Sequence, residues 1–179
     1  MRSNEEWIQI FGSIRHDWLN VLQLIKGNLA LGNEERVMAV IQEAVEQTAN
    51  ESRLCSLGMP KTTLLLLEQK WKPTQHPLDI EVDGELFPLT NYDDLLYACF
   101  DCFFNNYNEV VDAEESDKTT ISFTFFDEKC LIELSYDNDL SESAFHECLA
   151  DMPPAIKVEL LEREGYAITF LLDASQMQE

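Results

Sequence analysis

Basic residues and long apolar runs are scarce in this sequence. Its 12 Lys and Arg residues face 34 Asp and Glu residues, which gives a formal net charge of −22. Proteins that bind a phosphate backbone need clustered Lys and Arg, so we expect no nucleic-acid partner. No run of about 18 uncharged apolar residues occurs, and the first residues do not resemble a signal peptide. We therefore expect a cytoplasmic protein that does not span a membrane.

Cysteine is also sparse, and its spacing is not that of a disulfide framework. The five cysteines are odd in number, which indicates reduced thiols. Cys99 and Cys102 form a CxxC pair on a helical pattern, but no second pair follows at zinc spacing, so we expect no metal site. The hydrophobic content of 45% is enough for a core and predicts one or two small domains.

Residues 1–57 carry the pattern of two long helices. In the first, which should run to about Leu31, apolar residues recur every three or four positions. Gly32 and Asn33 then break the pattern, and Gly58 followed by Pro60 should end the second helix. The prediction is an antiparallel helical hairpin whose first helix has this apolar seam: Trp7, Phe11, Ile14, Trp18, Val21, Ile25 and Leu29.

His16 lies off this seam. When Phe11, Trp18 and Ile25 are assigned to position a of a heptad, His16 falls at f, which points away from the neighbouring helix. An exposed imidazole is largely neutral at neutral pH, and its free ring nitrogen can attack phosphorus. A lone exposed histidine is more often inert, so the residues around it must decide between these interpretations.

Those residues resemble a known family. The segment RHDWLNVLQLIKGNLAL, residues 15–31, resembles the phosphoacceptor helix of the sporulation initiation phosphotransferase B family of Bacillus and, more loosely, that of the citrate and fumarate sensor kinases. In those families an acid follows the histidine directly and an asparagine stands at the fourth position after it. Asp17 and Asn20 occupy these places. The resemblance is specific over the first 57 residues and implies that His16 is the phosphoacceptor and catalytic residue.

Four neighbours of His16 are candidates for phosphotransfer support or partner docking. Asp17 could orient or polarise the imidazole, and Asn20 could hydrogen-bond a phosphoryl oxygen or a docked protein. Arg15 could offset negative charge, although its position e fits a contact with the neighbouring helix equally well. Gly12, one turn earlier, leaves room for a docking partner or for close helix packing.

The apolar stripes of the hairpin are too wide for two helices to cover. The economical solution is a second copy of the chain, which would form a four-helix bundle across a two-fold axis. The short connection at residues 58–62 argues against folding the hairpin back onto the rest of the chain. We therefore expect a homodimer, and the family resemblance points the same way.

Residues 58–179 predict an α/β domain. Helical patterns cover 62–72, 91–111 and a short stretch from 141, and alternating patterns predict strands at 78–82, 119–126, 130–136, 156–160 and 166–172. This order resembles the ATP-binding domain of histidine kinases. The predicted fold class is α+β: a helical hairpin (1–57) for dimerisation and phosphoacceptance, followed by an α/β sandwich (58–179) resembling a degenerate kinase domain.

The nucleotide-binding features of that kinase domain are missing. Asn105 and Asn106, with Asn108, fall where an asparagine-rich helix would bind magnesium and phosphates. However, residues 136–140 contain no glycine, and Gly165 is the only glycine after Gly84. Without glycine, side chains hinder the approach of backbone amides to phosphates, and the acidic surroundings would repel a triphosphate. We therefore predict no nucleotide-binding site and interpret the two asparagines as helix surface.

A phosphoacceptor histidine without a nucleotide site must receive its phosphoryl group from another protein. The resemblance implies two response regulators, one donating from an aspartyl phosphate to His16 and one accepting, in the initiation of sporulation. Mg²⁺ would be bound by the acidic pocket of the regulator and not by this chain. The least acidic part is residues 1–57, with five basic and eight acidic side chains against seven and 26 in residues 58–179. The alternatives are an ATP-dependent histidine kinase and a non-enzymatic dimeric adaptor.

Overall fold

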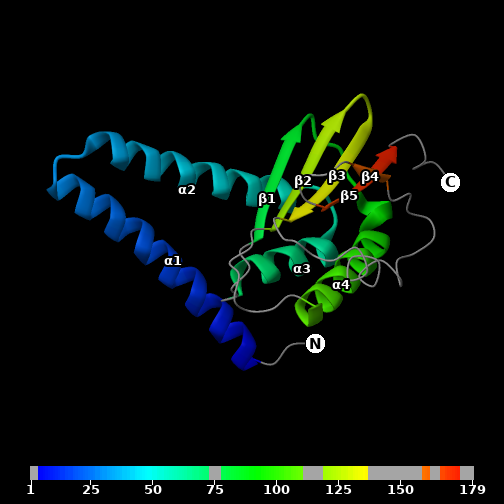
Figure 1. Cartoon of the computed structure of the whole chain (residues 1–179), viewed down its shortest axis with the longest axis horizontal. Helices are drawn as coiled ribbons and strands as arrows, with labels where there is room; N and C mark the ends of the chain where they lie inside the picture. Colours follow the sequence, from blue (N-terminus) through cyan, green and yellow to red (C-terminus); the bar gives the residue numbers. More distant parts are fainter. Residues whose placement is uncertain (1–3, 73–77, 111–118, 137–158, 162–165, 174–179) are drawn as a thin grey trace.

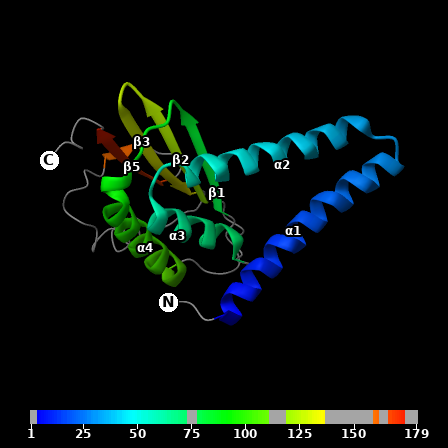
Figure 2. The same cartoon turned by 180° about the vertical axis from the view of Figure 1, so that it is seen from behind.

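Two long helices form an arm that extends from a body of helices and strands (Figures 1 and 2). The computed structural model describes residues 4–72, 78–110, 119–136, 159–161 and 166–173. The elements follow in this order: α1 Asn4–Ala30, α2 Glu34–Cys55, α3 Pro60–Trp71, β1 Leu78–Gly84, the 3₁₀ helix η1 Thr90–Tyr92, α4 Asp93–Val110, β2 Thr119–Phe126, β3 Lys129–Tyr136, β4 Glu159–Leu161 and β5 Tyr166–Asp173.

The strands form one mixed sheet in the order β1-β2-β3-β5-β4. β1 is parallel to β2, and the other neighbours are antiparallel. Burial alternates along β2, so one face of the sheet packs against α3 and α4 (Figures 1 and 2). The predicted order of helical and strand segments is confirmed for these elements. The helix predicted from residue 141 lies outside the described residues.

The helical arm and the body share one hydrophobic core. Leu54, Leu57 and Met59, at the junction of α2 and α3, are at most 1% exposed and belong to the same cluster as Phe100 and Phe123. The backbone N–H of Leu89 donates to the carbonyl of Leu57 at 2.8 Å. The predicted division after residue 57 remains a prediction, and the core of the body extends across it.

α2 is also bonded to the edge strand of the sheet. The Asn50 side-chain oxygen accepts from the Val82 N–H at 3.0 Å, and the Arg53 guanidinium donates to the Gly84 carbonyl at 2.7 Å. Gly84 has φ +92°, and a Cβ there would lie 2.1 Å from the Phe125 carbonyl oxygen. The helix therefore occupies hydrogen-bonding groups that an uncovered edge would leave open.

Asp93 caps the N-terminus of α3 from the start of α4. Its carboxylate accepts from the backbone N–H of Thr62 at 2.9 Å and from that of Lys61 at 3.1 Å, while the Thr62 hydroxyl donates to its carbonyl at 3.0 Å. Met59, the N-cap residue of α3, supplies no side-chain hydrogen bond. Burial raises the pKa of Asp93, but the bonds from Thr62 and Lys61 outweigh it and lower the pKa overall.

We expect Asp93→Ala to lower the free energy of unfolding by about 1.5–3 kcal/mol, because the buried N–H of Thr62 and the partly buried N–H of Lys61 lose a charged acceptor. The folded-state pKa lies below the unfolded-state value, so this stabilisation is present above the unfolded pKa and is lost as pH falls through the folded pKa. Urea unfolding should show a constant difference from wild type near pH 7 and a shrinking one below about pH 4. Asp94→Ala, at a side chain that is 84% exposed, is the matched control and should change stability little.

The described cysteines are free thiols that differ in burial. Cys99 and Cys130 are buried, and burial raises the pKa of each to about 12, whereas Cys55 is exposed. Since only the thiolate reacts, we expect Ellman's reagent at pH 8 to label Cys55 rapidly in the native protein. Cys55→Ser should remove one rapidly reacting thiol, and Cys99→Ala should remove none. A loss of rapid labelling in Cys99→Ala would contradict this assignment.

Candidate functional site

His16 lies near the middle of α1 with its side chain 71% exposed. Its Nδ1 atom is 3.2 Å from the Asn20 amide nitrogen and 3.5 Å from the nearer Asp17 carboxylate oxygen. Residues four apart on a helix are neighbours on its surface, so the contact with Asn20 follows from local geometry. Two of the four supporting candidates, Asp17 and Asn20, thus lie against the same ring nitrogen.

These contacts give the two imidazole nitrogens of His16 different surroundings. When Nδ1 carries no proton, the Asn20 amide donates to it, and the proton is on Nε2. When Nδ1 is protonated, it donates toward the Asp17 carboxylate, and Nε2 has a free lone pair. The second tautomer makes Nε2 the nucleophilic atom and leaves it on the side of the ring away from Asp17.

Arg15 and Gly12 have a different relation to His16. The Arg15 side chain is exposed, and a Cβ built at Gly12 would meet only its guanidinium, at 4.0 Å. A Cβ at Gly27 would meet nothing within 4 Å. Within one chain, close packing therefore does not require glycine at either position. Room for a docking partner and close packing against another helix of a bundle both remain predictions for Gly12.

Away from His16, α1 and α2 enclose an apolar groove. The helices meet at the turn after α1 and diverge from there (Figure 1). Trp18 and Leu22 line the groove and are 49% and 58% exposed, and Phe11 is 52% exposed. The heptad assignment placed Phe11 and Trp18 against a neighbouring helix, but within one chain about half of each surface is uncovered. The groove is lined by Trp18, Val21, Leu22, Ile25, Ile41, Ala44, Val45, Thr48, Ala49 and Ser52.

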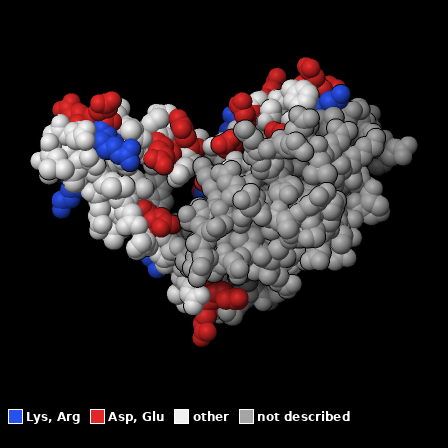
Figure 3. Space-filling model, in the orientation of Figure 1, with Lys and Arg blue, Asp and Glu red and all other residues white. Residues whose placement is uncertain are grey.

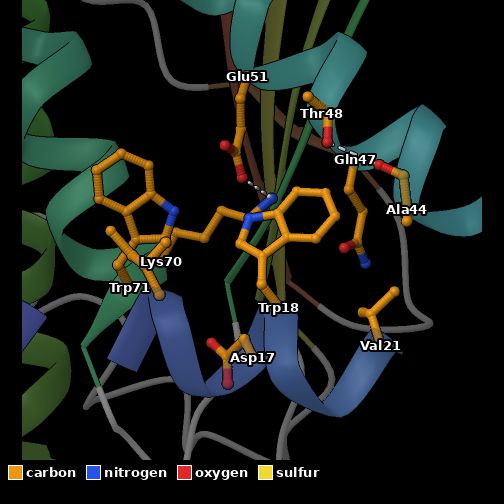
Figure 4. Close-up of a pocket in the computed structure, with 10 residues that line it drawn as sticks. Asp17, Trp18, Val21, Ala44, Gln47, Thr48, Glu51, Lys70 and Trp71 are labelled. Atoms are coloured by element: carbon orange, nitrogen blue, oxygen red, sulfur yellow. Dashed lines mark hydrogen bonds and ion pairs between the residues drawn. The ribbon is translucent and has the colours of Figure 1, made fainter. Parts of the chain in front are cut away.

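A second pocket, of about 140 Å³, lies where α1, α2 and α3 meet (Figure 4). Lys70 from α3 extends between the indoles of Trp71 and Trp18 toward Glu51 of α2, and its Nζ is 3.1 Å from the Glu51 carboxylate. The two side chains are 14% and 27% exposed. Asp17 lines this same pocket. No sequence pattern predicted this pocket, because Glu51 and Lys70 come from separate helices and have no characteristic spacing.

Comparison with known proteins supports the sequence-based resemblance. Residues 1–57 match the family model of the Sensor_kinase_SpoOB-type, alpha-helical domain. The chain is 38% identical over 117 residues to the Sporulation initiation phosphotransferase B of Bacillus subtilis (strain 168). The predicted resemblance is confirmed. The match spans 65% of this chain and 61% of that relative, so the chain covers about three-fifths of the relative's length.

Two solved structures are similar in outline. One is the histidine kinase ThkA in complex with response regulator protein TrrA, with a TM-score of 0.45 and 12% identity over 94% of this chain and 62% of that chain. The other is the Acinetobacter baumannii histidine kinase AdeS, with a TM-score of 0.41 and 9% identity over 89% of this chain and 98% of that chain.

The described part of the chain also bears on the predictions for the asparagines of α4, for a metal site and for a membrane span. Asn105 is exposed on α4, while the side chains of Asn106 and Asn108 are not described. Among the described residues, no group of three or more His, Cys, Asp or Glu side chains could hold a metal ion, and no helix is long and apolar enough to cross a bilayer. On the face in Figure 3, the α1–α2 arm carries basic and acidic side chains intermixed.

Proposed function

We propose that this chain is a phosphorelay phosphotransferase of a two-component system that acts in the cytoplasm in the initiation of sporulation. The observation that carries the proposal is an exposed imidazole, His16, whose Nδ1 faces Asp17 and Asn20 inside the segment that matches the SpoOB-type sensor-kinase helical domain. The identity to a sporulation initiation phosphotransferase over 117 residues supports the same class of reaction. The donor and acceptor are the phosphorylated aspartate of one response regulator and the free aspartate of a second.

The proposed reaction is two displacements at phosphorus. In the first, Nε2 of His16 attacks the aspartyl phosphate, a P–N bond forms, and the P–O bond to the aspartate breaks as the carboxylate leaves with the electron pair. The Nδ1 proton stays on the ring, and the Asp17 carboxylate stabilises the resulting positive charge. In the second, the carboxylate of the other regulator attacks, and the P–N electrons return to Nε2. Positioning and charge neutralisation supply most of the acceleration.

Asn20 and Arg15 support this reaction in different ways. Asn20 donates to Nδ1 in the resting tautomer, so its amide must turn or release when the proton moves to Nδ1. The released amide is free to hydrogen-bond a phosphoryl oxygen or the docked regulator. Arg15, exposed beside Gly12, places a cation on the surface where an acidic regulator pocket would approach. Mg²⁺ would be held by that pocket of the regulator and would neutralise charge on the phosphoryl group.

A homodimer completes the arm in this proposal. The apolar groove between α1 and α2 exposes about half of Trp18 and more than half of Leu22, on the side of α1 away from His16. A second copy would cover this surface in a four-helix bundle and leave both His16 side chains outside. Residues 58–179 act as a degenerate kinase-like α/β domain that binds no ATP, because the segment 136–140 contains no glycine to let a backbone approach phosphates.

The test mixes the protein with a ³²P-phosphorylated response regulator in the absence of ATP. The proposal expects label on this chain that is acid-labile and base-stable, as phosphohistidine is, and that a second regulator removes. Labelling by ATP alone would instead favour the histidine kinase. If neither source labels the chain while a regulator still binds it, the adaptor is the correct function and the phosphotransferase proposal is wrong.

A further inference from the structure

The pocket at the junction of α1, α2 and α3 contains one cation and two carboxylates that could neutralise it. The Lys70 ammonium is paired with Glu51 at 3.1 Å, and both side chains are largely buried. Asp17 lines the same pocket from α1, below Trp18 in Figure 4. The carboxylate of Asp17 also lies 3.5 Å from Nδ1 of His16. Asp17 is therefore shared between the pocket and the candidate phosphoacceptor.

The charge balance of this pocket bears on the partner of Asp17. A lysine that is 14% exposed needs a counterion, because an unpaired ammonium out of water is costly. Its side chain is long and flexible, and Asp17, whose side chain is 67% exposed, is the other carboxylate that lines the pocket, so it is the alternative partner for the ammonium when Glu51 is removed. While Glu51 holds the ammonium, Asp17 is left to the imidazole.

We propose that Glu51 is a positioning residue for phosphotransfer that acts through Lys70: by pairing with the ammonium it keeps Lys70 off Asp17, so that Asp17 can hold the Nδ1–H tautomer of His16. This inference rests on the proposed function. It assigns a role in the reaction to Glu51 of α2, which does not touch the substrate. Lys70 would compete with the His16 imidazole for the Asp17 carboxylate if Glu51 did not hold it. Removing the competitor should therefore be harmless, and removing only its partner should not.

The experiment is a double-mutant cycle on the full-length chain. Glu51→Gln should slow labelling from the phosphorylated regulator roughly tenfold, which is the effect of losing one charge-assisted hydrogen bond. Lys70→Met keeps the aliphatic stem between the two indoles and should label at close to the wild-type rate. The double variant Glu51→Gln with Lys70→Met should also recover that rate. Glu68→Gln is the matched control, because Glu68 of α3 pairs with Lys72, the residue directly after that helix, and does not line the pocket.

A second readout separates this inference from the proposed function. Long-range ¹H–¹⁵N spectra of the imidazole report the fraction of His16 with its proton on Nδ1, whether or not the protein transfers phosphate. That fraction should fall in Glu51→Gln and return in the double variant. Equal loss in Lys70→Met and Glu51→Gln, without recovery in the double variant, would mean that the pair only braces the helices and would overturn the inference. If the wild type is not labelled but the tautomer fractions of His16 change as expected, the phosphotransferase proposal is wrong, and only the effect of Glu51 on the His16 tautomer stands.

Discussion

His16→Ala is expected to reduce phosphoryl acceptance from a response regulator by at least about 10³-fold, because the variant lacks the nucleophile itself. The side chain is 71% exposed, and alanine is the best helix former, so the variant should fold and should retain the stability of the wild type. Acid-labile label after mixing with the phosphorylated regulator is the measurement. Gln23→Ala, at another exposed position of α1, is the control and should label normally.

The neighbours of His16 should give a graded series in the same assay. Asp17→Asn keeps the shape of the side chain but removes the charge that stabilises the protonated ring, so we expect a roughly tenfold slower transfer. Asn20→Ala removes the donor to Nδ1 and should shift the imidazole toward the Nδ1–H tautomer. Its phosphoryl transfer should therefore be affected less than that of Asp17→Asn. Full labelling of the His16→Ala variant would place the acceptor at another residue and contradict the whole series.

The local part of the site could be predicted from the sequence, because a helix fixes it. His16, Asp17 and Asn20 lie on one helix, so helical periodicity alone brings the amide of Asn20 to the imidazole. The strand segments could also be predicted from their alternation: β4 at 159–161 overlaps the segment predicted at 156–160, and β5 at 166–173 matches the one predicted at 166–172. The two strands pair antiparallel. The insertion of β5 between β3 and β4 is a long-range pairing that no local pattern encodes.

Contacts between separate elements could not be predicted either, because no local sequence pattern encodes them. The heptad pattern identifies an apolar stripe on α1 but cannot say what covers it, and the most buried residue of the helix is Ile10, at 3% exposure, which the seam did not include. The Glu51–Lys70 pair joins helices whose approach depends on the whole fold. The bonds from Asn50 and Arg53 to β1 likewise depend on where α2 ends relative to the sheet.

These long-range contacts bear on how the arm and the body move. α2 is bonded to β1, its last residues enter the core of the body, and Lys70 ties it to α3. A kinase whose nucleotide domain delivers phosphate to its own histidine needs that domain to approach the helix. Here an approach of the body to His16 would have to change the contacts that α2 makes with β1 and α3, which costs free energy. Delivery of the phosphoryl group by a separate regulator needs no such movement, which favours the phosphotransferase over the kinase.

The other large effect is expected at the apolar groove, where Leu22→Glu should dissociate the proposed homodimer. Leu22 is 58% exposed in the single chain and lines the groove that a second copy would cover. A two-fold interface contains each substitution twice, and each buried carboxylate without a partner costs several kcal/mol. We expect the dimer dissociation constant to rise by about 10³-fold or more, which corresponds to about 4 kcal/mol.

Leu24→Glu is the matched control for this prediction, because Leu24 is on the same helix, is 50% exposed and does not line the groove. Sedimentation equilibrium should give twice the chain mass for the wild type and for Leu24→Glu, and the mass of one chain for Leu22→Glu. A monomeric wild type would contradict the four-helix bundle. Equal dissociation by both variants would move the interface to another face of α1. Because His16 lies away from the groove, a monomeric Leu22→Glu that still accepts phosphate would show that the dimer supports the helix without contributing residues to the reaction.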